Sequence, residues 1–226
     1  MADIEQGTPE WFEARRGCVT ASRVADVIAK TKSGPAASRK NYLAQLVAER
    51  LTGEVAESYS NAAMQWGTVT EPMARAAYAF YSGQAVEEAG FVLHPSIADT
   101  GASPDGYVGD EGLVEIKCPN TATHIDTLLG QKVPGKYVTQ IQWQLACTDR
   151  QWCDFVSFDP RMPEELRLFV IRIERDEDRI KELSLEVQGF LIDVRETAAS
   201  LQALNAEPVD MANQPAEVQI ETSGVT

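Results

Sequence analysis

The sequence predicts an α/β protein in which a mixed sheet of about five strands is flanked by helices. Short segments of alternating apolar and polar residues, separated by turn residues, lie between residues 85 and 173, as half-buried strands require. Longer segments on both sides carry apolar residues at helical spacing. The chain of 226 residues is long enough for one large core. A sheet covered by helices buries the apolar faces of both kinds of element.

Five segments have the composition and alternation of strands. The expected strands are Ala85–Leu93, Thr100–Val108, Gly112–Cys118, Gln151–Phe158 and Leu166–Ile173. The third is expected to be the most buried. Turn residues from Asp159 to Pro163 separate the last two strands.

Segments with helix signals lie before, between and after these strands in the sequence. Thr8-Pro9-Glu10 combines an N-cap with proline at the first helical position, and Gly17 closes that short helix. The other expected helices are Ala21–Ala29, Ala37–Leu51, Asn61–Tyr81, Thr121–Leu129, Lys136–Ala146 and Arg175–Leu204. The expected helix Ala37–Leu51 has an apolar stripe of Tyr42, Leu43, Leu46 and Val47, and the last helix has one of Ile180, Leu183, Val187, Phe190, Leu191 and Val194. We expect one domain over residues 1–204 and an extended or mobile tail over 205–226, which holds little core material.

Composition restricts the class of protein. The chain has no run of eighteen apolar residues, and its first residues are acidic, so we expect neither a membrane span nor a secretory signal and place the protein in the cytoplasm. The four cysteines lack a C-x2-C pair, which favours reduced, mostly buried thiols over an iron-sulfur cluster.

The charge distribution is uneven. A net charge of −14 argues against a nucleic-acid partner, because contacts of Lys and Arg with phosphates dominate such binding. The segment from Ala14 to Ala48, here called the basic segment, nevertheless carries seven basic residues and one acid. This asymmetry is expected if DNA is held in a groove or channel. A solvated basic helix face is the alternative.

The strand Leu113 to Lys117 presents a carboxylate and an ammonium side by side. Because side chains alternate along a strand, Glu115 and Lys117 share one face and Ile116 takes the other. Asp105 precedes the Gly-rich turn that leads into this strand. A four-residue turn would oppose Asp105 to Ile116, whereas a five-residue turn starting at Val108, or a bulge, would oppose it to Glu115.

Two acids at this distance favour a bound cation. Carboxylates a few ångströms apart repel each other unless a cation lies between them, and oxygen ligands select Mg²⁺ or Mn²⁺. A neighbouring lysine can help such an ion to activate water against a phosphorus atom. The residues therefore predict a metal-dependent nuclease centre, with a solvated hairpin face as the alternative.

The same residues resemble a known family. Ser103-Pro104-Asp105, nine further residues, and then Glu115-Ile116-Lys117-Cys118-Pro119 are similar to the PD-(D/E)xK pattern of restriction-endonuclease-like nucleases. Together with shorter matches from about Trp11 to about Glu174, they most resemble the phage lambda exonuclease family, also called YqaJ-type viral recombinase nucleases. The resemblance implies a restriction-endonuclease-like fold for the domain.

The resemblance also implies roles for individual residues. Metal ions, Mg²⁺ with Mn²⁺ able to substitute and two ions expected, would be held by Asp105, Glu115 and the Ile116 carbonyl, assisted by Glu71. Lys117 would orient or activate the attacking water. The remaining implied residues are Tyr137 and Gln140 for orienting water and phosphate, Arg15, Ser22 and Lys32 for the terminal phosphate of DNA, and Met64 as a wedge between the strands. For Met64, core packing is the alternative.

The implied activity is processive 5′→3′ digestion of one strand of linear double-stranded DNA, which leaves a 3′ overhang for a single-strand annealing recombinase. The family also implies a ring-shaped homotrimer, its channel lined by Arg15 to Lys40. No G-x4-G-K-[ST] loop is present, so ATP use is not expected. His94 and His124 fit no nuclease pattern and are read as structural or surface residues. A restriction- or repair-type endonuclease and a catalytically silent DNA-binding module of the same fold remain alternatives.

Overall fold

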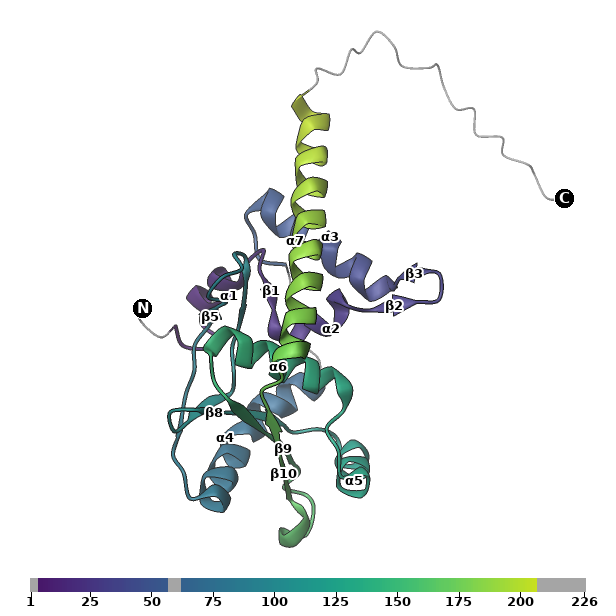
Figure 1. Ribbon diagram of the computed structural model, residues 1–226. Helices are drawn as coiled ribbons and strands as arrows, with labels where there is room; N and C mark the ends of the chain where they lie inside the picture. The colour runs from purple at the N-terminus through teal and green to yellow at the C-terminus, as the bar shows by residue number, and fades with distance from the viewer. Residues whose placement is uncertain (1–3, 57–61, 207–226) are drawn as a thin grey trace, which may run out of the picture.

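The computed structural model, which describes residues 4–56 and 62–206, contains a mixed five-stranded sheet with helices on both faces (Figure 1). The strand order is β10 (Leu168–Glu174), β9 (Trp152–Phe158), β8 (Gly112–Lys117), β7 (Gly106–Val108) and β4 (Val86–Glu87). Only the β8–β9 pair is parallel among the pairs of this sheet. The predicted fold class is therefore confirmed.

Strand β8 lies at the centre of this sheet, and its two faces are covered by different helices. Leu113 packs in a cluster with residues of α6 (Gly135–Thr148), including Ile141 and Leu145. Val114 and Ile116 belong to another cluster, which includes Ala74 and Tyr78 of α4 (Ala62–Ser82). A further helix, α5 (Thr121–Gly130), follows β8. The alternation predicted for this strand is thus present.

A second layer is built on a small sheet. Its order is β1 (Val19–Thr20), β6 (Thr100–Ala102) and β5 (Val92–Leu93), and α1 (Pro9–Arg15) precedes β1. The 3₁₀ helix η1 (Ala21–Arg23), α2 (Val24–Val27), α3 (Ala37–Thr52) and α7 (Glu177–Ala206) pack beside it, with the β2–β3 hairpin (Lys30–Thr31, Gly34–Pro35) between α2 and α3.

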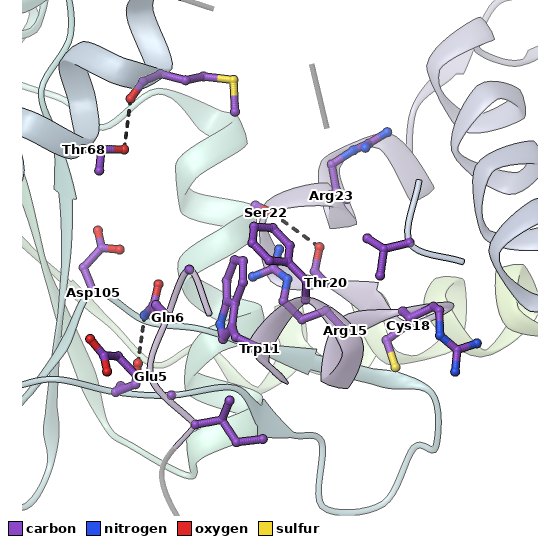
Figure 2. A pocket seen from close by; sticks show the side chains of 18 of the residues that line it. Glu5, Gln6, Trp11, Arg15, Cys18, Thr20, Ser22, Arg23, Thr68 and Asp105 are labelled. Atoms are coloured by element: carbon purple, nitrogen blue, oxygen red, sulfur yellow. Dashed lines mark hydrogen bonds between the residues drawn. The ribbon is translucent and has the colours of Figure 1, made fainter. Parts of the chain in front are cut away.

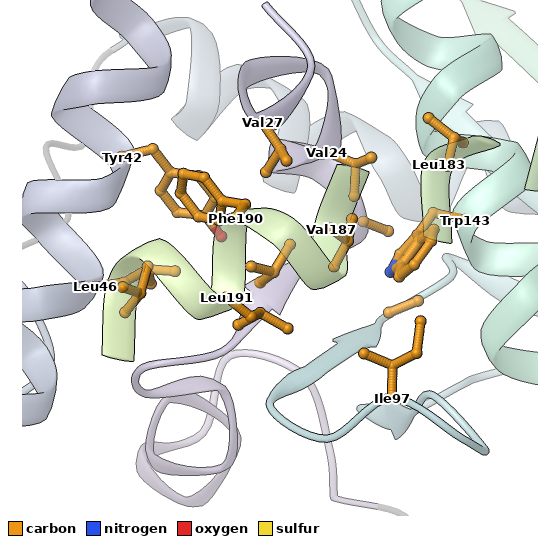
Figure 3. Packing of buried hydrophobic residues seen from close by; sticks show 14 of the residues in the cluster. Val24, Val27, Tyr42, Leu46, Ile97, Trp143, Leu183, Val187, Phe190 and Leu191 are labelled. Carbon is orange, nitrogen blue, oxygen red and sulfur yellow. The ribbon is translucent and has the colours of Figure 1, made fainter. Parts of the chain in front are cut away.

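The core of this second layer contains the predicted apolar stripes (Figure 3). Tyr42 stacks on Phe190 with 5.6 Å between ring centroids, and Trp143 of α6 is fully buried in the same cluster. Every residue of the predicted α7 stripe is buried. In the α3 stripe, Tyr42, Leu46 and Val47 are buried and Leu43 is half-buried.

Three predicted elements are divided in the structure. The expected helix Ala21–Ala29 is a 3₁₀ turn followed by one short α-helix, because the Ala29 carbonyl accepts the amide of Ala36 at 3.0 Å and closes the hairpin instead. Ala85–Leu93 and Thr100–Val108 each form two strands that belong to different sheets. The chain passes between the sheets at residues 88–91 and 103–105, and Pro104, which lacks an amide hydrogen, interrupts the second strand.

The helix termini follow the predictions closely. Gly53, with φ of +71°, ends α3 in the left-handed conformation that glycine favours. Helix α7 continues to Ala206, and the rest of the predicted tail lies outside the described residues. Within the described ranges, none of the helices is long and apolar enough to cross a membrane.

The start of β8 yields a test of the packing. A Cβ atom on Gly112 would lie 2.2 Å from the Trp152 ring, so Gly112→Ala must displace β9 or the indole. Overpacking of this kind costs about 1–3 kcal/mol of unfolding free energy. Urea denaturation should show this loss. Gly189→Ala on α7, where a Cβ meets nothing within 4 Å, should instead stabilise the helix by about 1 kcal/mol. Equal effects of both substitutions would contradict the packing of Gly112.

Candidate active site

Glu115 is a fully buried carboxylate at the centre of the sheet. Its Oε1 accepts a hydrogen bond from Gln140 Nε2 at 2.6 Å, and its Oε2 accepts one from Gln144 Nε2 at 2.6 Å. Lys117 makes an ion pair with it from the same strand face. These donors offset the large cost of removing a carboxylate from water.

Asp105 lies opposite Glu115, in the register that a five-residue turn predicts. Strand β7 pairs Tyr107 with Leu113, and extending this pairing opposes Asp105 to Glu115. Asp105 Oδ2 accepts the Ile116 amide at 2.6 Å. Burial, followed by the charge of Glu115, raises the pKa of Asp105 well above its usual value.

Lys117 and Tyr137 complete this face of the site. Burial acts to lower the pKa of Lys117, but the charges of Glu115 and Asp105 outweigh it and raise the pKa. The ammonium lies 5.5 Å from the centroid of the Tyr137 ring, which stacks on Phe155. The structure therefore brings together five of the predicted residues: Asp105, Glu115, Lys117, Tyr137 and Gln140.

Glu71 approaches from α4 on the other side. Its Oε1 accepts a hydrogen bond from Arg75 at 2.7 Å, and Arg75 also binds Glu88 at 2.8 Å. Glu71 and Asp105 line the same pocket of about 970 Å³. The pocket lies between α4 on one side and α1, residues 18–23 and α3 on the other, and Figure 2 shows part of its lining.

Arg15 lines this pocket and makes no ion pair with any described carboxylate (Figure 2). Its guanidinium lies 3.8 Å from the centroid of the Trp11 ring, and its Nη1 donates to Ser103 Oγ at 3.3 Å. Burial lowers the pKa of Arg15 to about 10, so the side chain remains charged at neutral pH. A partly desolvated, unpaired guanidinium is suited to binding an anion.

Ser22 also lines the pocket, but Lys32 does not. Lys32 is exposed in the turn between β2 and β3. The structure therefore separates Lys32 from the other two residues that were grouped with it for the terminal phosphate. Spacing along the chain could not reveal this separation, because the β2–β3 hairpin places Lys32 outside the pocket lining.

The basic segment is largely neutralised by acids. Arg16 pairs with Glu13, Arg23 with Asp26, Lys30 with Glu186 and Arg39 with Asp193. Four of the seven cations therefore make ion pairs, two of them with the distant helix α7. The continuous cationic surface inferred from composition is consequently reduced.

Met64 lies at the pocket with 53% of its surface exposed. This exposure excludes the core position that was the alternative for Met64.

The donor atoms present fit a hard divalent cation. Asp105, Glu115 and Glu71 supply carboxylate oxygens, and burial, followed by the charge of Glu115, raises the pKa of Asp105. As the side chains stand, no three His, Cys, Asp or Glu residues of the described chain converge on one metal position. Glu71 is held by Arg75, and Glu115 by its amide and ammonium donors.

The Arg161 side chain connects α4 to the segment that follows β8. Arg161 Nε donates to Asp159 Oδ1 at 2.7 Å, its Nη2 donates to the Pro119 carbonyl at 3.2 Å, and its guanidinium lies 4.4 Å from the Trp66 ring centroid. Burial acts to raise the pKa of Asp159, but hydrogen bonds from Arg161 and Thr121 hold it at about 2. The contacts of Arg161 thus hold α4, which carries Glu71, near the end of β8, which carries Lys117.

Both histidines have structural contacts. His124 is fully buried; its Nε2 donates to the Leu166 carbonyl, and its Nδ1 accepts from Ser157, both at 2.8 Å. His94 Nδ1 accepts the amides of Ser96 and Ile97, and its ring stacks on Trp143. The interpretation of both as structural or surface residues agrees with these contacts.

Sequence reasoning missed several residues of the site. Gln144 lies seven residues after Tyr137 and four after Gln140, so helical spacing could have indicated that it shares their face. Ser103 was quoted only as part of the acidic pattern, although it contacts Trp11 and Arg15. Gln6, which lines the pocket, had no signal in the sequence.

The chain is similar to known proteins of one family. Residues 10–151 match the model of the YqaJ-like viral recombinase domain. An alkaline exonuclease, LHK-Exo from Laribacter hongkongensis, is 53% identical over 88% of this chain and 98% of its own, with a TM-score of 0.82. The LHK-Exo structure in complex with dAMP has the same identity and coverage, with a TM-score of 0.83.

A more distant structure shares the fold. The phage-related exonuclease from Haemophilus somnus 129PT has 17% identity, 81% coverage of this chain and 96% of its own, and a TM-score of 0.67. No curated protein matches the chain.

Proposed function

The chain belongs to the YqaJ-like viral recombinase domain family and is a nuclease of the lambda exonuclease type, and we propose that it is a Mg²⁺-dependent 5′→3′ exonuclease of double-stranded DNA. One observation carries this proposal: the structure contains both the buried Glu115–Lys117 ion pair and a pocket lined by Arg15, which makes no ion pair with a described carboxylate. The Glu115–Lys117 ion pair suits phosphodiester hydrolysis, and Arg15 suits binding of the terminal phosphate of a DNA strand.

Each residue has a physical role in this proposal. Asp105, Glu115 and the Ile116 carbonyl would hold Mg²⁺, with Glu71 assisting. The ion would supply an activated water and neutralise charge on the phosphoryl group. Lys117 would stabilise charge that develops on the phosphate oxygens. Gln140 orients Glu115 through its hydrogen bond, and Tyr137 packs beside Lys117. Mn²⁺ would substitute, since it accepts the same oxygen ligands.

The pocket supports recognition of an end. Arg15 and Ser22 would bind the 5′ phosphate, and Met64 would separate the terminal base pair. Digestion of one strand would leave a 3′ overhang, the substrate for a single-strand annealing partner. The recombinase family to which the chain belongs supports this role in recombination.

One experiment tests the function. A linear duplex labelled at either 5′ end is incubated with and without Mg²⁺, beside a covalently closed circle. We expect mononucleotides released from the 5′ ends only with Mg²⁺, and an intact circle. Cleavage of the circle would identify an endonuclease, and absence of any hydrolysis would identify a binding module.

Substitution of the two acids tests the metal site. Asp105→Asn and Glu115→Gln should each remove nearly all hydrolysis, since each deletes a charged ligand. Lys117→Ala should lower turnover by about 10², the scale of one lost electrostatic contact with the transition state, while duplex binding remains. Circular dichroism should show all three variants folded. Full activity in either acid variant would place the metal elsewhere.

The role of Arg15 is tested by the preference of the protein for 5′-phosphorylated over 5′-hydroxyl DNA ends. A charge-assisted contact is worth about 1.5–3 kcal/mol, so the wild type should favour 5′-phosphorylated over 5′-hydroxyl ends by roughly tenfold to 100-fold. Arg15→Ala should abolish this preference. Lys40→Ala, an exposed cation outside the pocket lining, is the control. If Arg15→Ala keeps the full preference for phosphorylated ends, the terminal phosphate does not bind in this pocket.

We further propose that the protein forms a closed homotrimer around DNA. Support comes from exposed apolar residues on α4, where Val69, Met73 and Phe80 are 74%, 55% and 92% exposed at positions that share one helix face. A neighbouring copy could cover them, and a ring explains processivity without tight binding. Light scattering should give three times the chain mass, and Phe80→Glu should lower it. A processive monomer would contradict the ring.

A further inference from the structure

Residues 103–105, here called the linker, connect the two sheets and end at Asp105. Strand β6 belongs to the small sheet and β7 to the large one, so the linker lies in neither. Asp105 is therefore not positioned by regular strand pairing of its own. Apart from the hydrogen bond that its carboxylate accepts from the Ile116 amide, its place depends on what holds the linker.

The second crossing between the sheets lies beside the linker. Residues 88–91 connect β4 of the large sheet to β5 of the small sheet. Gln6 joins the two crossings, because its Nε2 donates to the Ala89 carbonyl and to the Pro104 carbonyl, each at 2.8 Å. Both amide hydrogens of one side chain are thus used, and one of them is bound next to Asp105.

The segment that carries Gln6 is itself closely packed. A Cβ atom on Gly90 would lie 2.6 Å from the Ile4 carbonyl oxygen, so residues 4–7 lie directly against the second crossing. The same residues line the pocket with Asp105 (Figure 2). The linker is held from its other end by Trp11, whose Nε1 donates to Ser103 Oγ at 2.9 Å.

We propose that Gln6 is a positioning residue for Asp105 and sets the affinity of the site for a divalent cation. The inference rests on the proposed function, in which Asp105 is a ligand. With Gln6 in place, the Pro104 carbonyl is fixed and the Asp105 carboxylate has few orientations to lose when a cation binds. Without it, the linker samples more conformations, and binding must restrict them.

Gln6→Met is the informative variant, because it keeps the side-chain length and removes both donors. Gln6 is exposed, so the protein should fold. Gln188→Met, at an exposed glutamine on α7, is the matched control. Calorimetric titration with Mn²⁺ alone should show an affinity about three- to tenfold weaker for Gln6→Met, the range expected for losing one or two neutral hydrogen bonds. The Mg²⁺ concentration for half-maximal hydrolysis should rise by a similar factor.

A second readout needs no metal. Hydrogen exchange of the peptide containing residues 101–108 should be faster in Gln6→Met than in the wild type and in Gln188→Met, while the urea midpoint stays unchanged. Wild-type Mn²⁺ affinity in Gln6→Met would overturn the inference, as would a lowered urea midpoint with unchanged affinity, which would make Gln6 a purely structural contact. If the wild type itself neither binds Mn²⁺ nor hydrolyses DNA, the proposed function fails first.

Discussion

The rest of the structure depends on the burial of one carboxylate, that of Glu115. An ionised group with no exposed surface is tolerated only when its oxygens are bound by donors, and removing one partner of a buried pair costs about 3–5 kcal/mol. Here the donors are Lys117 on the same strand and Gln140 and Gln144 on α6. Helix α6 must therefore cross this face of the sheet at one position and rotation. The residues that stabilise the buried charge are the same residues that define the candidate site.

This constraint also links the two layers. Helix α6 packs Ile141 and Leu145 against the large sheet and Trp143 into the core beside the small sheet. It therefore orients both sheets relative to Glu115. The pocket lies where the sheets meet, and the linker that carries Asp105 crosses at the same place. Glu71 of α4, beside the large sheet, and Arg15 of α1, beside the small one, thus line the same pocket.

Much of this arrangement was predictable from sequence, and the exceptions share a physical cause. The faces of β8 follow from alternation, and the common face of Tyr137 and Gln140 follows from helical spacing, because both are local geometry. The register of Asp105 remained open, since turn length decides it and the glycines allowed either choice. The divided strands could not be seen, because the chain changes sheets within segments of only four and three residues, 88–91 and 103–105. The position of Lys32 outside the pocket lining could not be seen either, because a two-stranded hairpin intervenes.

The same reasoning explains how a chain with a net charge of −14 can offer an anion site. Lys30 and Arg39 pair with acids more than 150 residues away in sequence, so net charge along a segment does not measure the cationic surface. The exposed pair of Lys30 with Glu186 contributes little free energy and is screened by salt. Arg15 differs because it is partly desolvated, stacks on an indole and makes no ion pair with a carboxylate of residues 4–56 or 62–206. Its field is therefore less screened, and one such cation at a pocket can outweigh several neutralised ones at the surface.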